Sequence, residues 1–207
     1  MPRPPTSRPV RLWAIRGALG IAVLAALGLG RVISDAWPTG DSPEASFVRH
    51  GQVGDTVRLR YADVSVDRVA ATGSLATVAG GVRTSGIWLV VDLTVVARQR
   101  PLAAPRITIT DASGRIFSPD NRSGYLFTPA QTGIPWHVRV PVEMPQGDLV
   151  GLVLRLTGNT EDNRRDDVAS IDLGIDRSAA ERLEQEHAAV EVRQGGPDPL
   201  TAAGVSS

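Results

Sequence analysis

The chain has 207 residues and a formal net charge of zero, because its 22 basic residues, all arginine, balance 22 acidic residues, and it contains no cysteine. The lack of cysteine excludes disulfides, thiolate metal sites and thiol nucleophiles, and the lack of lysine excludes a Schiff-base lysine or a phosphate-loop lysine. Residues 1–31 hold five arginines and no acid, so the remainder has a net charge of minus five, which argues against a nucleic-acid partner.

An apolar segment near the N-terminus predicts insertion into a lipid bilayer. Residues 17–30 contain no polar side chain, and with their flanks residues 12–34 would form a helix of about 34 Å, enough to cross a hydrocarbon core of roughly 30 Å. We expect a transmembrane signal-anchor helix with arginines and tryptophans near its ends, at the interfaces. A cleaved export signal is the alternative, with a weak cleavage site at 32–34. The expected membrane positions are Leu12, Trp13, Arg16, Ile21, Leu24, Leu27, Arg31 and Trp37.

The charges before this helix predict its orientation. Arg3, Arg8 and Arg11 precede it without any acidic residue, so residues 1–11 are expected to be a cytoplasmic basic tail. The chain after the helix would then lie outside the cytoplasm, attached to the cell membrane by a single pass. Residues 35–46 contain proline, glycine and serine without apolar periodicity, which indicates a polar stalk.

Alternation of apolar and polar residues predicts short strands in the rest of the chain. The clearest run, 87–95, is expected to be a central strand, and the polar residues on its second face predict only partial cover. In 57–69 the apolar phase slips, which predicts either a bulge or bend near Ala62 in one long strand or two short strands. Residues 111–114 form a turn pattern between two apolar segments, a hairpin signal. Further strands are expected at 136–142, 152–156 and 168–173.

One helix is expected near the C-terminus. Residues 178–181 fit a capping box and are followed by apolar residues at helical spacing, which predicts a helix over 178–188. Residues 190–192 alternate and could instead end in an edge strand. Residues 194–207 are predicted to be a disordered tail. The whole pattern is mainly β and predicts an antiparallel immunoglobulin-like β-sandwich over residues 47–193, preceded by one transmembrane helix and ending with a short helix.

Several stretches resemble a known class of domains. They are Ser85–Val95, Asp111–Arg115, Pro135–Trp136, Val140–Pro145 and Ile171–Gly174. With the basic start and the apolar anchor, they are similar to the telokin-like, immunoglobulin-like ectodomains of bacterial membrane proteins and lipoproteins. The resemblance implies an exported, non-enzymatic module without catalytic residues. This chain departs from the lipoprotein members because it lacks the lipid-accepting cysteine.

No catalytic, cofactor-binding or metal-binding residue is predicted, and no cofactor. Residues 161–167 are rich in carboxylates, and a solvated loop is favoured over a Ca²⁺ site because two arginines interrupt them. The three histidines, at positions 50, 137 and 187, lack any metal-ligand spacing. Trp88 and Trp136 could form an aromatic binding surface, but core packing is favoured at least for Trp136.

The adjacent apolar residues Tyr125, Leu126 and Phe127 are a candidate interaction surface, or else a cap on one end of the sandwich. The expected function is therefore a non-enzymatic module that is held at the lipid bilayer and binds or positions another envelope or membrane protein. The alternatives are an exported ligand- or Ca²⁺-binding domain and a cleaved secreted protein. The oligomeric state is left open.

Overall fold

The structure, a computed structural model, describes residues 46–158, 167–185 and 188–200. Its elements, in chain order, are β1 (Phe47–Gln52), β2 (Thr56–Arg58), β3 (Ala62–Thr77), β4 (Gly80–Ala97), β5 (Arg106–Thr110), β6 (Ile116–Phe117), the 3₁₀ turn η2 (Asn121–Ser123), β7 (Trp136–Met144), β8 (Val153–Thr157), β9 (Asp167–Asp172), α2 (Arg177–Glu184) and β10 (Val190–Glu191).

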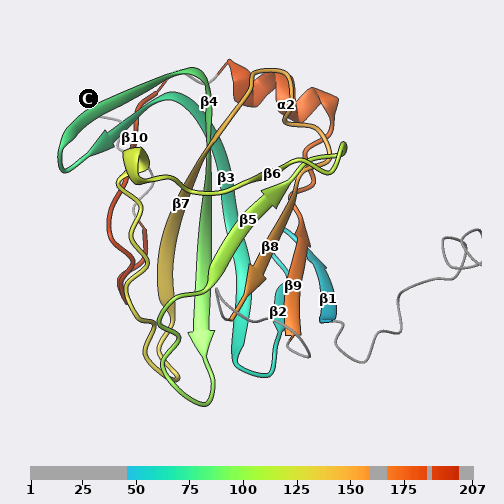
Figure 1. Ribbon diagram of the computed structural model, residues 1–207, viewed down its shortest axis with the longest axis vertical. Helices are drawn as coiled ribbons and strands as arrows, with labels where there is room; N and C mark the ends of the chain where they lie inside the picture. The colour runs from blue at the N-terminus through green and yellow to red at the C-terminus, as the bar shows by residue number, and fades with distance from the viewer. Residues whose placement is uncertain (1–45, 159–166, 186–187, 201–207) are drawn as a thin grey trace, which may run out of the picture. The chain divides into compact units, whose positions relative to one another are not determined.

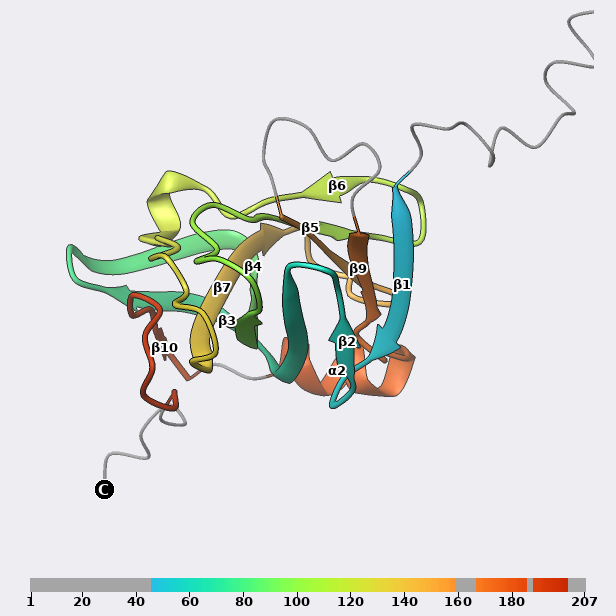
Figure 2. The same cartoon turned by 90° about the horizontal axis from the view of Figure 1, so that it is seen from below.

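These strands form two sheets that pack as a β-sandwich (Figures 1 and 2). One sheet has the order β1-β9-β8-β5-β6, and the other has the order β10-β3-β4-β7, with β2 also paired to β3. The main core lies between them and is built from aliphatic side chains of both sheets, such as Leu93, Val140, Leu154 and Ile171. The mainly-β, two-sheet sandwich with one short α-helix is thus confirmed.

The strand predicted at 87–95 is central, as expected, because β4 lies between β3 and β7. Its inward residues, such as Leu89 and Leu93, belong to the main core. The expectation of partial cover on its second face is wrong. Trp88 and Val90 on that face are fully buried, in a second small core completed by Val190 and Val192 from the C-terminal segment.

The change of apolar phase in residues 57–69 arises because the chain reverses direction there, and not from a bulge at Ala62. β2 and β3 are separate strands that pair antiparallel, with Val57 opposite Val64. Both residues therefore point into the same core from opposite sides of a tight turn. The irregularities of β3 lie further along, between Val66 and Arg68 and between Thr72 and Ser74. Of the two alternatives, one bent strand or two short strands, the second is correct, although β3 is long rather than short.

Two strand pairs differ from the predicted antiparallel arrangement. β1 runs parallel to β9, and β10 runs parallel to β3. Both are sheet-edge pairs formed by the first and last strands of the described chain. Because neither is joined to its neighbour by a hairpin, its direction is not imposed by a short turn. The alternation of side chains, which is all that the sequence shows, is the same in both directions.

Helix α2 begins at Arg177, four residues before the Glu181 that suggested a capping box, and it has a different cap. Asp176 is the N-cap residue, and its Oδ1 accepts a hydrogen bond from the backbone N–H of Ala179 at 2.7 Å. The hydroxyl of Ser178 donates to the same oxygen at 2.9 Å. The helix ends at Glu184, before the predicted limit of 188. A carboxylate two residues earlier thus replaces the expected serine, since both types cap well.

The C-terminal segment (residues 188–200) extends past the predicted domain limit at residue 193. Gly196 exchanges two backbone hydrogen bonds with His137 on β7, and the carbonyl of Gly195 accepts from the hydroxyl of Thr128. The segment therefore crosses the outer face of the second sheet from the β3 edge to the β7 edge. Disorder of residues 194–207 was predicted from their composition. Composition does not show that the apolar outer face of a distant sheet can bind such a segment.

No helix within the described ranges is long and apolar enough to cross a bilayer. The predicted basic tail and transmembrane helix lie outside these ranges, as do the stalk up to residue 45 and residues 201–207. All eight positions expected in or beside the membrane belong to the part that is not described, so the anchor remains a prediction.

Candidate partner-binding groove

The side of the sandwich where β6 and β7 form the edges of their respective sheets carries an open groove of about 500 Å³. We refer to it as the β6–β7 groove. It is lined by Ser85, Gly86, Ile116, Phe117, Ser118, Asp120, Glu143, Met144 and Pro145. The lining comes from both sheets and from the loop after β6, so one wall is apolar and the other is polar.

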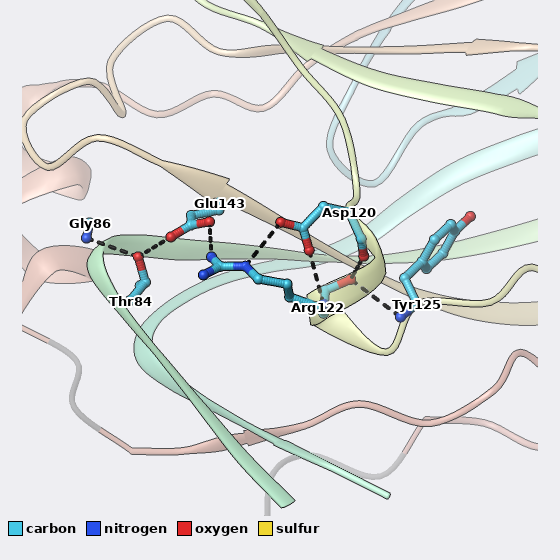
Figure 3. Close-up of polar contacts among 7 residues, drawn as sticks. Thr84, Gly86, Asp120, Arg122, Tyr125 and Glu143 are labelled. Carbon is cyan, nitrogen blue, oxygen red and sulfur yellow. Dashed lines mark hydrogen bonds and ion pairs between the residues drawn. The ribbon is translucent and has the colours of Figure 1, made fainter. Parts of the chain in front are cut away.

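Arg122 organises the polar wall (Figure 3). Its guanidinium forms ion pairs with Glu143 on β7 and, at 3.5 Å, with Asp120 at the start of η2. The hydroxyl of Thr84 on β4 donates to the other oxygen of Glu143. The hydrogen bond to Glu143 raises the pKa of Arg122, which therefore stays charged. These contacts connect β4, β7 and the loop around η2.

The turn η2 places Arg122 by local hydrogen bonding. Asp120 caps the turn, and its Oδ1 accepts from the backbone N–H of Ser123 at 3.0 Å. Gly124 follows with a φ of 67°, in the left-handed region that glycine adopts at low cost. The guanidinium of Arg122 also lies over the ring of the buried Trp88, 5.8 Å from its centroid.

The apolar wall comes from the β5–β6 hairpin, which the sequence predicted. Asp111 and Arg115 close the turn by a backbone hydrogen bond of 3.1 Å, and Ile109 pairs with Phe117. Phe117 packs against the main core, whereas the Ile116 side chain is 65% exposed at the rim of the groove.

Gly86 is required where β4 passes the end of β7. A Cβ atom at this position would overlap the carbonyl oxygen of Met144. The backbone N–H of Gly86 donates to the hydroxyl of Thr84 at 2.9 Å, which fixes the irregular path of β4 beside the groove. Glycine is thus needed here for close backbone approach rather than for an unusual φ.

The predicted interaction surface at 125–127 is only partly a surface. Tyr125 and Phe127 pack against the main core and cap it, and Leu126 alone is exposed. Burial raises the pKa of Tyr125 well above its ordinary range. The two tryptophans considered for an aromatic surface do not form one, since Trp88 is fully buried and Trp136 is half-buried against the core.

The carboxylate-rich stretch lies outside the described residues except for Asp167. That residue is buried, and its Oδ2 accepts from the backbone N–H of Arg60 at 2.8 Å. The described ranges contain no group of three or more histidine or acidic side chains that could hold a metal ion. His137 contacts the Thr94 hydroxyl at 2.9 Å, His50 is exposed, and His187 is not described.

Sequence reasoning missed the groove because its lining comes from three segments that are far apart in the chain, residues 85–86, 116–120 and 143–145. Arg122 and Glu143 are 21 positions apart, and neither belongs to a motif. The available signal was the candidate surface at Tyr125, Leu126 and Phe127, because Arg122 lies only three residues before it.

No protein-family model matches the chain, and no curated protein matches its sequence. The fold is similar to that of an uncharacterized β-sandwich protein from Clostridium difficile 630, with 12% sequence identity, a TM-score of 0.40, and coverage of 61% of this chain and 96% of the other. The resemblance to telokin-like ectodomains therefore stays a prediction.

Proposed function

We propose that this chain is a single-pass membrane protein that displays a non-enzymatic β-sandwich outside the cytoplasm, where the sandwich binds or positions another cell-envelope protein. Support for the membrane part comes from the sequence of residues 12–34 and the arginines before them. Support for the binding part comes from the β6–β7 groove.

The observation that carries the binding proposal is the exposed Ile116 beside a braced polar wall. An extended segment of a partner could bury an apolar side chain against Ile116 and Phe117 and donate backbone N–H groups to Asp120. The brace of Arg122 with Asp120 and Glu143 keeps the polar wall in place before binding, which reduces the entropy lost on association.

The same contacts favour binding over catalysis. Both carboxylates at the groove, Asp120 and Glu143, already accept hydrogen bonds from Arg122. Acid–base catalysis needs a proton-transfer group that faces the substrate, whereas these groups link three segments of the fold.

Orientation can be tested by cysteine labelling, because the native chain has no cysteine. We expect a membrane-impermeant maleimide to label Ser118→Cys in intact cells and to label Ser7→Cys only after permeabilisation. Labelling of Ser7→Cys alone in intact cells would contradict the proposed orientation, and recovery of the protein in the soluble fraction would contradict the anchor.

Binding can be tested by crosslinking in native membranes from two single-cysteine variants. Ser118→Cys lies in the groove, and Ala104→Cys lies in the exposed loop before β5. We expect a heterologous envelope protein to be captured from Ser118→Cys but not from Ala104→Cys, and the capture to be lost when Ile116→Arg is added. Equal capture from both positions, or capture that survives Ile116→Arg, would exclude the groove.

The Ca²⁺ alternative has its own measurement. A ligand that binds only the folded state raises the thermal unfolding midpoint. We expect the midpoint to be the same with millimolar Ca²⁺ and with a chelator, and a rise with Ca²⁺ would favour the alternative instead.

A further inference from the structure

The C-terminal segment is bound to the outer face of the second sheet in the way that an extended peptide binds a receptor. Side chains of the sheet, and of the loop before β7, donate hydrogen bonds to its backbone carbonyls. These are the hydrogen bonds of Thr72 with Ala188 (2.7 Å), Arg139 with Glu191 (2.9 Å) and Thr128 with Gly195 (2.7 Å). Every peptide has backbone carbonyls, so these contacts fix the path of an extended chain without selecting its side chains.

Three positions of the segment do depend on the side chain. Val190 and Val192 are both buried and pack with Trp88 in the second core. Gly195 lies so close to β7 that an added Cβ atom would be 3.2 Å from the Val138 side chain. The face therefore selects an extended segment with two valine-sized residues in alternate positions and a glycine three residues after the second.

The segment leaves one buried polar group of this face without a partner. The indole nitrogen of Trp88 is buried, and no residue in the described ranges accepts a hydrogen bond from it. A buried donor without an acceptor is unfavourable, because it has lost its hydrogen bond to water and gained none in return. A segment that placed an oxygen atom beside this nitrogen would therefore fit the face better than residues 188–200 do.

The face would also keep its structure if the segment left it. Arg139, which donates to the segment, is held on its other side by the bidentate ion pair with Asp92 on β4. The attachment itself is short, since only two residues of the segment pair with β3 and Gly196 alone bridges to β7. A binding face that is already in place reduces the entropy lost when another segment binds.

We propose that this face is a second partner-binding site, where an extended segment of another protein displaces the C-terminal segment. The partner segment would carry a valine and a threonine in alternate positions, followed three residues later by a glycine. Its threonine hydroxyl would accept the hydrogen bond from Trp88. Residues 188–200 occupy the site in the absence of this partner. The proposal goes beyond the proposed function and does not depend on the membrane anchor or on the β6–β7 groove.

The first experiment asks whether the segment leaves the face while the sandwich stays folded. It uses single cysteines in the full chain, solubilised in mild detergent, and a maleimide that reacts only with an exposed thiol. Val192→Cys should be labelled at least tenfold faster than Val140→Cys in the main core, because release of the segment is more frequent than global unfolding. Equal labelling rates would overturn the proposal.

The second experiment measures binding of an added peptide by fluorescence anisotropy. The probe is a labelled peptide with the sequence of residues 188–200. It should bind the full-length Val192→Asp chain at least tenfold more tightly than the native chain, whose own segment competes at a high local concentration. Val150→Asp is the matched control at an exposed position and should behave as the native chain does.

Two outcomes of this measurement would overturn the proposal. One is no binding to the Val192→Asp chain, and the other is equal binding to all three chains, which would place the peptide elsewhere. If circular dichroism shows that the Val192→Asp chain is unfolded, the labelling rates decide.

The third experiment tests the hydrogen bond to Trp88 with two further peptides, which carry Val190→Thr or Val192→Thr. We expect one of them to bind the Val192→Asp chain at least as tightly as the native peptide, and to shift the indole N–H resonance of Trp88. A hydroxyl that finds no partner in an apolar core is unfavourable, so a tenfold loss of affinity for both peptides would overturn the proposed partner chemistry.

Discussion

Arg139 on β7 and Asp92 on β4 form a bidentate ion pair beneath the C-terminal segment. Nε and Nη2 of Arg139 lie 2.7 and 2.9 Å from the two carboxylate oxygens, and the residues are only 3% and 7% exposed. The remaining nitrogen of Arg139 donates to the carbonyl of Glu191 at 2.9 Å. The pair therefore links the two strands to the segment that covers them.

Removing one residue of this buried ion pair should destabilise the fold. We expect Asp92→Ala to lower the free energy of unfolding by about 3 kcal/mol, because Arg139 would be left charged and buried. Asp92→Leu combined with Arg139→Met should recover most of the loss. Urea denaturation measures both. The control is Asp63→Ala, whose partially exposed pair with Arg98 should be worth under about 1 kcal/mol. Equal losses for Asp92→Ala and Asp63→Ala would show that the buried pair is solvated.

The C-terminal segment should contribute to stability through its buried valines. Val192 packs in the second core with Trp88. We expect Val192→Asp to cost about 3 kcal/mol or more, since it places an unpaired carboxylate against apolar side chains. The control is the same substitution at the exposed Val150. The free energy of unfolding of Val150→Asp should stay within about 0.5 kcal/mol of that of the native chain. A mild effect of Val192→Asp would mean that the segment detaches easily.

Gly86 should tolerate no side chain. We expect Gly86→Ala to lower the free energy of unfolding by about 2 kcal/mol, because β4 or β7 must shift to relieve the overlap with Met144. Gly81→Ala on the same strand has nothing within 4 Å of its added methyl group and should be close to neutral. Thermal unfolding of the two variants makes the comparison, and similar midpoints would contradict the close approach.

The β5–β6 hairpin should weaken at acid pH through Asp111. Burial tends to raise the pKa of this carboxyl, but hydrogen bonds from Ser113 and Arg115 lower it from 3.8 to about 2. Because the folded pKa lies below the unfolded one, the ionised form stabilises the fold above about pH 4. This contribution is lost as the pH falls through 2. We expect Asp111→Asn to be less stable than the native chain at pH 7 and equal to it near pH 2. A difference independent of pH would exclude this cause.

Local patterns were sufficient for several elements. The alternation at 87–95 identified β4, and the turn residues from Asp111 to Gly114 identified the β5–β6 hairpin. Both signals depend on neighbouring residues, through side-chain periodicity and turn chemistry. The N-cap of α2 moved from Ser178 to Asp176 because either residue type can cap a helix, and the surrounding fold selects between them.

The sequence by itself determined the mainly-β class, the two faces of β4 and the absence of cysteine and lysine chemistry, since these follow from composition and short-range periodicity. Only the tertiary structure decided that Val190 and Val192 cover Trp88, that β1 and β10 run parallel to their neighbours, and that Arg122 reaches Glu143. These features join segments far apart in the chain. Their free energy comes from buried apolar area and paired charges, which no local pattern records.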